Sequence, residues 1–207
     1  MTRKKPSAPL GLSVDALKPV VSGFDLRDWA GSDPGRLLAA LGQTPTLQAL
    51  HALSPWRFTA ALAPPTAARL EGRDLPIRPI VDFCRNRMAA AVADLLIVEG
   101  VGGVMSPLAE HATGLDLMTA LNLPTILVGG AYLGAISHTL TALEVLRTRR
   151  LEVAAVVISG SADLESPDFV QTVGLVTDFA GDLPVIAAPR NDALLDLIPG
   201  LFQTLCL

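Results

Sequence analysis

The 207-residue sequence is 50% hydrophobic and 17% charged, has a mean hydropathy of +0.46 and carries a formal net charge of −4. A chain of this length can bury a full core, so we expect one domain over residues 1–207, with residues 1–10 disordered. The acidic balance and the scattered basic residues argue against a nucleic-acid partner.

The number of cysteines and the lengths of the apolar runs bear on the cellular compartment and on zinc binding. Cys84 and Cys206 are too few for a disulfide framework and lack the spacing of a zinc site. No signal-peptide core follows the basic start, and no apolar run approaches the about 20 residues of a membrane-spanning helix. We therefore expect a cytoplasmic protein with no membrane partner.

Short apolar runs alternate with helical patterns along the chain, which predicts an α/β protein with a doubly wound, mostly parallel sheet and helices on both faces. The expected strands, each buried on both faces, are Leu12–Leu17, Asp94–Val98, Thr125–Val128, Val153–Ile158 and Val185–Ala187. The expected helices are Ile80–Ala93, Gly114–Leu121, Ile136–Arg150 and Ser166–Phe179. The segment between Gly23 and Ile80 is poor in β-pattern and is expected to hold short helices around Pro34–Leu41, Thr44–Leu50 and Thr66–Glu71.

The residues that follow the strands are the first candidates for chemistry, because ligands of doubly wound sheets bind beyond the carboxyl ends of the strands. We expect these segments to converge on one rim. In chain order they begin at Lys18, at Glu99 with its glycine-rich turn, at Gly129, at Ser159 and at Pro189.

Three charged residues near this rim each have a functional and a structural interpretation. Glu99, beside Gly100 and Gly102, suits an oxygen ligand for Mg²⁺ next to phosphates, or else it caps a turn and faces water. Lys18 suits a carboxylate, carbamate or phosphate, or else its stem covers the sheet edge. Asp33 precedes a helical pattern, and on residue type alone a helix N-cap is favoured.

The segment from Gly130 to His138 predicts an anion site, because it leads into the N-terminus of a long helix near Ser137. Exposed N–H groups and the helix dipole there suit a substrate carboxylate. His111 and His138 have no metal-ligand spacing and receive no role.

Several segments, taken in chain order, resemble the dethiobiotin synthetase family. The resemblance runs from about Leu12 to Asn191, and EGVGGVMSPL and LGAISHT are its most specific segments. The segments that carry it are Leu17–Gly23, Ser32-Asp33, Trp56–Phe58, Leu70–Gly72, Val98–Leu108 and Leu133–Thr139.

The resemblance implies a P-loop-type α/β ligase that acts as a homodimer in biotin biosynthesis. Such enzymes use ATP and Mg²⁺ to convert 7,8-diaminopelargonate and CO₂ to dethiobiotin, ADP and phosphate. One substrate amine takes up CO₂ as a carbamate, ATP phosphorylates the carbamate, and the second amine closes the ureido ring.

Carried over residue by residue, the resemblance implies a role for each candidate. Lys18 becomes the catalytic lysine that holds the carbamate and the transferred phosphoryl group, and Ser22 becomes a substrate contact. Asp33 and Glu99 become Mg²⁺ and nucleotide ligands, so the resemblance favours a ligand over a cap at Asp33. The other nucleotide-binding positions are Gly100, Val101, Gly102, Ser159, Gly160, Pro189, Arg190 and Asn191. The substrate carboxylate, bound across the dimer interface, is received by Leu133, Gly134, Ala135, Ile136 and Ser137.

One departure from the family concerns the phosphate-binding loop. The sequence contains no G-x-x-x-x-G-K-[ST] motif, and residues 1–10 stand where a strand, that loop and a helix are expected. We expect the natural protein to begin upstream, because a sheet without a central βα unit leaves unpaired backbone and unburied surface. The 207-residue chain itself is expected to hydrolyse ATP poorly. The alternative is a non-catalytic paralogue without a P-loop, acting as a dimeric module that binds a ligand or a partner.

Overall fold

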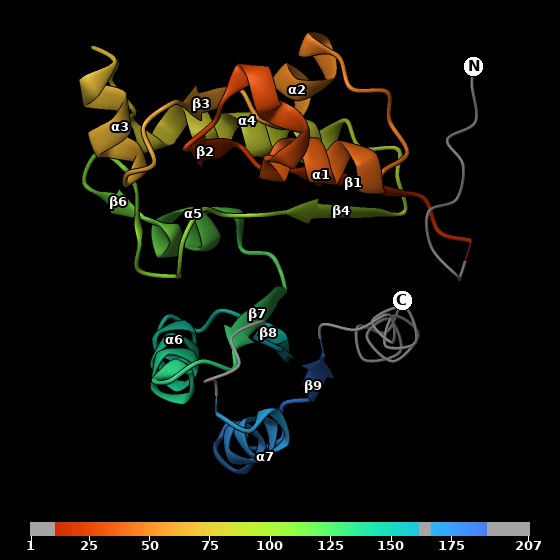
Figure 1. The fold of residues 1–207 in the computed structure, drawn as a ribbon, viewed down its shortest axis with the longest axis vertical. Helices are drawn as coiled ribbons and strands as arrows, with labels where there is room; N and C mark the ends of the chain where they lie inside the picture. The colour runs from red at the N-terminus through yellow and green to blue at the C-terminus, as the bar shows by residue number, and fades with distance from the viewer. Residues whose placement is uncertain (1–10, 162–166, 190–207) are drawn as a thin grey trace. The chain divides into compact units, whose positions relative to one another are not determined.

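The computed structural model describes residues 11–161 and 167–189, and the chain divides into two compact units, residues 1–121 and 122–207 (Figure 1). Parallel strands combine with helices in both units, which confirms the α/β class. The expected disorder of residues 1–10 lies outside the described residues. No helix within the described ranges is long and apolar enough to cross a membrane.

From residue 11 onward, the strands of the first unit form three pairs. Strand β1 (Val14–Leu17) pairs in parallel with β4 (Leu95–Val98), and β2 (Val20–Ser22) pairs in parallel with β3 (Trp56–Phe58). The short strands β5 (Pro107–Ala109) and β6 (Ala112–Thr113) pair antiparallel. Because Lys18-Pro19 separates β1 from β2, the chain changes pairing partner directly after the lysine.

The described helices of the first unit are mostly short. The short helices between β2 and β4 are η1 (Leu26–Gly31), α1 (Asp33–Ala40), α2 (Leu47–Leu53) and α3 (Pro64–Leu70), followed by α4 (Ile77–Ala89). Helix α5 (Gly114–Leu121) has the predicted bounds. Helix α2 begins later than predicted because the side chain of Thr46 accepts the N–H of Ala49 at 3.0 Å. Strand β3 was not predicted in this region, since three residues are too few to show an alternating pattern.

Among the described residues, a larger and a smaller buried cluster help to hold the first unit together. Phe58 of β3 lies in the larger cluster, with partners from α3, α4, β5 and α5, such as Ala67, Ile80 and Leu108. The smaller cluster joins Val21 and Phe24 to α1 and α2. Strand β2 therefore contributes side chains to both clusters.

Over its described residues, 122–161 and 167–189, the second unit is a three-stranded parallel sheet with two helices. Its strands, in spatial order, are β7 (Thr125–Gly130), β8 (Val153–Ser159) and β9 (Val185–Ala188). Helices α6 (Ala135–Thr148) and α7 (Phe169–Ala180) pack against each other and against the sheet. Helix α7 starts after the predicted Ser166 because the side chain of Asp168 caps it. All five predicted strands are thus confirmed, with small differences at their ends.

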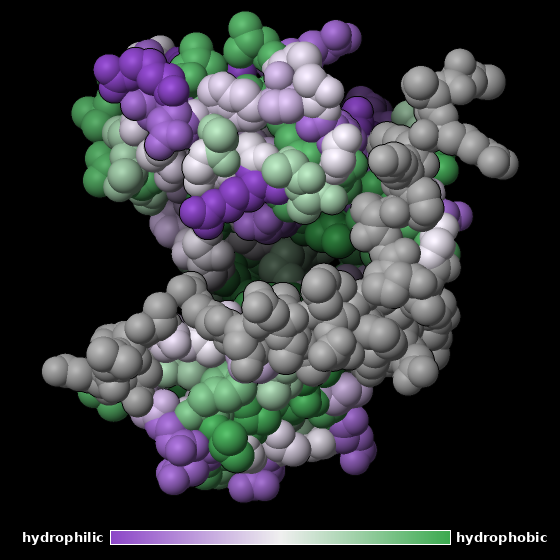
Figure 2. Space-filling model, turned by 45° about the vertical axis from the view of Figure 1, so that its right-hand side comes forward, coloured by the Kyte–Doolittle hydropathy of each residue, from purple (hydrophilic) through white to green (hydrophobic). Residues whose placement is uncertain are grey.

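Burial of the strands is less complete than the sequence predicts. In β7, Leu127 is buried, whereas its neighbours Ile126 and Val128 are 37% and 64% exposed. In β4, Ile97 is 47% exposed. Adjacent residues of a strand point to opposite faces, so one face of β7 is covered and the other is open. Hydrophobic surface is visible on both units in Figure 2.

We predict that Phe58→Ala lowers the free energy of unfolding by about 3–5 kcal/mol, because it leaves a cavity in the larger cluster. The matched control is Leu70→Ala at the end of α3, where the side chain is 69% exposed and the change should stay within about 0.5 kcal/mol. Urea unfolding of both variants measures the difference. Equal losses in the two variants would show that Phe58 does not anchor this core.

Candidate functional site

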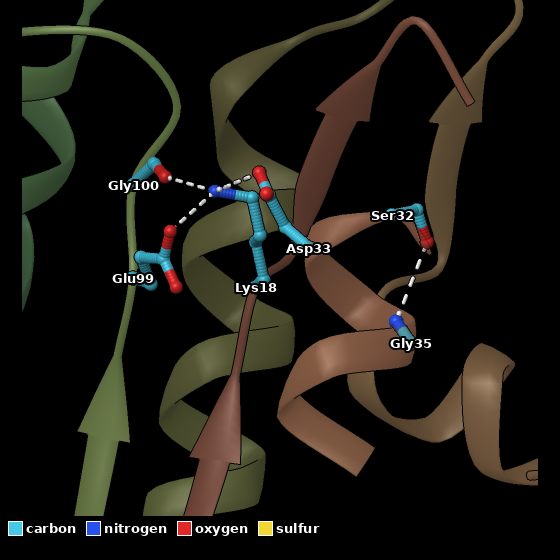
Figure 3. A network of polar contacts seen from close by, with 6 residues as sticks. All are labelled: Lys18, Ser32, Asp33, Gly35, Glu99 and Gly100. Atoms are coloured by element: carbon cyan, nitrogen blue, oxygen red, sulfur yellow. Dashed lines mark hydrogen bonds and ion pairs between the residues drawn. The ribbon is translucent and has the colours of Figure 1, made fainter. Parts of the chain in front are cut away.

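A buried lysine of the first unit lies between two carboxylates. Only 4% of the Lys18 side chain is exposed. Its Nζ donates to Glu99 Oε1 at 2.7 Å and to the carbonyl oxygen of Gly100 at 2.9 Å, and it pairs with Asp33 Oδ2 at 3.1 Å (Figure 3). The expectation that Lys18 and Glu99 meet at the carboxyl ends of their strands is confirmed.

Strand register places Lys18 beside Glu99. Leu17 and Val98 are partners in the β1–β4 ladder, so the residues that follow them emerge side by side. The backbone pairing extends one residue beyond the end of β4, because Glu99 N–H donates to the carbonyl of Leu17 at 2.7 Å. Lys18 N–H donates to the carbonyl of Leu53, at the end of α2, at 3.1 Å. Hydrogen bonds on both sides therefore fix the backbone from which the lysine side chain extends.

Asp33, at the start of α1, lies beside the same ammonium group. Ser32, not Asp33, is the N-cap, because its side chain accepts the N–H of Gly35 at 3.3 Å. The cap interpretation of Asp33 is therefore wrong, and its carboxylate is available to Lys18. A Cβ on Gly35 would lie 2.2 Å from the Trp29 carbonyl oxygen, so glycine is needed for α1 to begin against η1.

The glycine-rich turn after Glu99 is held in shape by Ser106. Gly103 N–H donates to the Ser106 hydroxyl at 2.8 Å, and Gly102 has φ +70, which favours glycine. Among the described residues, no acceptor takes the N–H groups of Gly100, Val101 and Gly102. Sequence reasoning gave Ser106 no role, although a serine three residues after a glycine turn is a signal for such a bond.

Ser22 ends β2, opposite Phe58, and is half-buried. It belongs to the same unit as Lys18, and no hydrogen bond among the described residues joins the two side chains.

The predicted nucleotide-binding residues that follow β8 and β9 lie together in the second unit. Gly130, Ser159 and Ala188 are consecutive partners across the three strands. Gly160 N–H donates to the Ala188 carbonyl at 2.8 Å, and Pro189 follows directly. Ser159, Gly160 and Pro189 therefore share one end of the sheet. Arg190 and Asn191 lie outside the described residues.

The loop from β7 to α6 places the predicted carboxylate-binding residues. Leu133 is 88% exposed, Gly134 is the N-cap with φ +93, and α6 begins at Ala135 rather than near Ser137. The Tyr132 hydroxyl lies 3.0 Å from His138 Nδ1 and ties the loop to the first turn of the helix. This pair was missed, because only the left-handed turn at Gly134 brings residues six apart into contact.

The oxygen atoms around Lys18 fit a hard divalent cation. Two carboxylates and a main-chain carbonyl already surround one positive charge, the ammonium group. Within the described ranges no group of three or more His, Cys, Asp or Glu side chains could hold a metal ion. Two carboxylates are nevertheless what Mg²⁺ commonly takes from a protein when phosphates supply further oxygens.

Comparison with known proteins gives one consistent family. A family model described as an AAA domain matches residues 8–192. The chain is 59% identical over 181 residues to a protein of Phenylobacterium zucineum named ATP-dependent dethiobiotin synthetase BioD, covering 87% of this chain and 77% of the relative. Relatives of the same name from Caulobacter vibrioides and Methylobacterium nodulans are 51% and 47% identical, covering 87% and 76% of this chain and 80% and 72% of theirs.

The parallel strands, the strand-end charges and the matched family model define a P-loop-NTPase-like α/β protein. Within that class, the chain belongs to the dethiobiotin synthetase family.

A second polar cluster in the first unit involves Glu71, part of a segment that carried the family resemblance. Its Oε1 accepts the N–H and the hydroxyl of Thr59 at 2.7 and 2.8 Å, and Oε2 lies 3.4 Å from Arg73. Chiefly the backbone N–H of Thr59 holds the pKa of Glu71 below its ordinary value of 4.5. Glu71 therefore ties the end of α3 to the loop after β3.

We predict that Ser32→Ala lowers the free energy of unfolding by about 1 kcal/mol, because it removes the cap of α1. Ser32→Thr keeps the hydroxyl that accepts the Gly35 N–H and donates to the Trp29 carbonyl, and it is the matched control, with little expected change. Urea unfolding measures both variants. An unchanged stability of Ser32→Ala would contradict the assignment of this cap.

We predict that the stability advantage of the wild type over Glu71→Gln shrinks in acid. The folded pKa of Glu71 is lowered, so its contribution is complete above about pH 4.5 and is lost as the pH falls through the folded pKa. Unfolding free energies of the two proteins at about pH 7 and about pH 3.5 measure this. A difference that stays constant across this range would refute the role of the carboxylate.

Proposed function

We propose that the protein is an ATP-dependent dethiobiotin synthetase. It forms the ureido ring of dethiobiotin from 7,8-diaminopelargonate and CO₂ in biotin biosynthesis, and it releases ADP and phosphate. The single observation that carries the proposal is the cluster that Lys18 and Glu99, at adjoining strand ends, form with Asp33 at the start of α1, in a chain whose relatives bear this name.

Lys18 is the catalytic residue of the proposal. Phosphoryl transfer depends mostly on positioning and on neutralising the charge of the phosphate oxygens. The ammonium group is buried and hydrogen bonds on both sides fix the backbone that carries it, so the side chain extends from a defined point before substrate binds. It holds the carbamate oxygen and then the transferred phosphoryl group, and Ser22 contacts the substrate beside it.

Asp33 and Glu99 hold Mg²⁺ in the proposed site. Mg²⁺ supplies positive charge to the phosphate oxygens of ATP when it is bound. Both carboxylates are close to half exposed, at 54% and 47%, so a ligand can reach them from solvent. The N–H groups of Gly100, Val101 and Gly102 take phosphate oxygens, and the adenine lies against Ser159, Gly160, Pro189, Arg190 and Asn191.

The α6 end of the second unit receives the substrate carboxylate in this proposal. The first turn of a helix presents N–H groups and a positive dipole end. The residues concerned are Leu133, Gly134, Ala135, Ile136 and Ser137, offered by the second subunit of a homodimer. The partners are small molecules, and the compartment is the cytoplasm.

Because a phosphate-binding motif is missing from these residues, the test compares two proteins. The 207 residues contain no G-x-x-x-x-G-K-[ST] motif, so we expect this chain alone to turn over slowly. Turnover is therefore measured both for the 207-residue chain and for the product of the whole gene, including any codons in frame before Met1.

We predict that the whole-gene product forms dethiobiotin and ADP from 7,8-diaminopelargonate, CO₂ and Mg·ATP. Lys18→Met should lower kcat by about 10²–10³, the usual effect of losing one preorganised charge. Arg78→Met is the matched control, because this cation on α4 is 90% exposed and its loss should leave kcat unchanged. Product formation is followed by mass spectrometry.

A whole-gene product that binds the diamine but forms no dethiobiotin would overturn the enzyme proposal. It would favour the non-catalytic binding module instead.

A further inference from the structure

We propose that Lys18 is an internal counter-ion that occupies the place of the divalent cation and keeps the nucleotide-free site from binding a metal. The inference rests on the proposed function, since it assigns Asp33 and Glu99 to that metal. It gives Lys18 a task in the resting protein that is separate from holding the phosphoryl group.

The arrangement around Nζ is that of a bound cation. Three oxygens, at 2.7, 2.9 and 3.1 Å, converge on this one nitrogen atom (Figure 3). All three are hard oxygen ligands of the kind that Mg²⁺ and Mn²⁺ take. The ammonium is thus placed where these oxygens would otherwise meet a metal ion.

Burial distinguishes this cluster from an ordinary surface ion pair. The lysine side chain is 4% exposed, whereas the carboxylates of Asp33 and Glu99 are 54% and 47% exposed. A metal ion arriving from solvent therefore meets carboxylates whose charge is already partly neutralised from the protein side. It must displace an ammonium that is tethered, desolvated and held by three acceptors.

Charge balance explains why the site binds a metal ion only when nucleotide is present. Two carboxylates and one ammonium leave a single net negative charge, which is a weak attraction for a divalent ion that must also lose water. A bound triphosphate adds enough negative charge to hold both the ammonium and a metal. Lys18 then moves from the carboxylates to phosphate or carbamate oxygens, so that metal loading requires nucleotide.

The experiment measures metal binding without turnover, on nucleotide-free protein. Mn²⁺ binding is followed by electron paramagnetic resonance, and the thermal unfolding midpoint is followed as Mg²⁺ is added. We expect the wild type to show little response to either ion. Lys18→Met and Lys18→Gln, which remove the charge, should bind Mn²⁺ at least about tenfold more tightly and unfold at higher temperature in Mg²⁺.

Two controls separate charge from packing. Lys18→Arg keeps the positive charge and should respond to metal as little as the wild type does. The double variant Lys18→Met with Glu99→Gln loses one carboxylate and should lose the gain in metal affinity.

Equal Mn²⁺ affinity in the wild type and both neutral variants would overturn the proposal. If neither neutral variant folds, Mn²⁺ binding by the wild type and by Glu99→Gln still tests the proposal. Nucleotide-free Mn²⁺ binding that Glu99→Gln abolishes would refute the counter-ion, and its absence, together with Mn²⁺ binding once ATP is present, would support it. Because the measurement needs no reaction, a failure here is distinct from an absence of dethiobiotin synthesis.

Discussion

An ammonium group buried at the end of a strand is stable only while oxygen atoms surround it, because an unpaired charge in the interior carries a large desolvation penalty. Lys18 meets this condition with three oxygens, and each depends on a different part of the first unit. The β1–β4 register supplies Glu99, the turn after β4 supplies the Gly100 carbonyl, and the start of α1 supplies Asp33. The local folding of all three segments is therefore tied to one side chain.

Sequence reasoning predicted the part of this site that depends on strands. Apolar runs that end in Lys18 and Glu99 identify two strand ends, and parallel strands bring their carboxyl ends to one edge. Asp33 could not be placed in this way. Its position depends on Ser32 taking the cap and on Gly35 fitting against the Trp29 carbonyl. The second is a contact with the preceding 3-10 helix, and no hydrophobic periodicity in the sequence predicts that helix.

The fold shows the same division between long and short elements. Five apolar runs and the long helices were predicted because burial repeats along them. Strand β3 has only three residues, and its pairing with β2 depends on Pro19 redirecting the chain after Lys18. The Tyr132–His138 contact likewise depends on the left-handed Gly134. Features that arise from one backbone angle or one tertiary contact leave no periodic trace in a sequence.

The placement of the candidate residues matches the demands of the proposed chemistry. Charge neutralisation acts only if the charges are fixed before reaction, since rearranging them during the reaction forfeits their effect. Lys18, Asp33 and Glu99 each lie within one residue of a strand end or a helix start, where hydrogen bonds fix the backbone. Leu133, by contrast, is exposed on the loop before α6. A loop can adjust to a flexible aliphatic substrate, whereas the lysine and the carboxylates must already be in position.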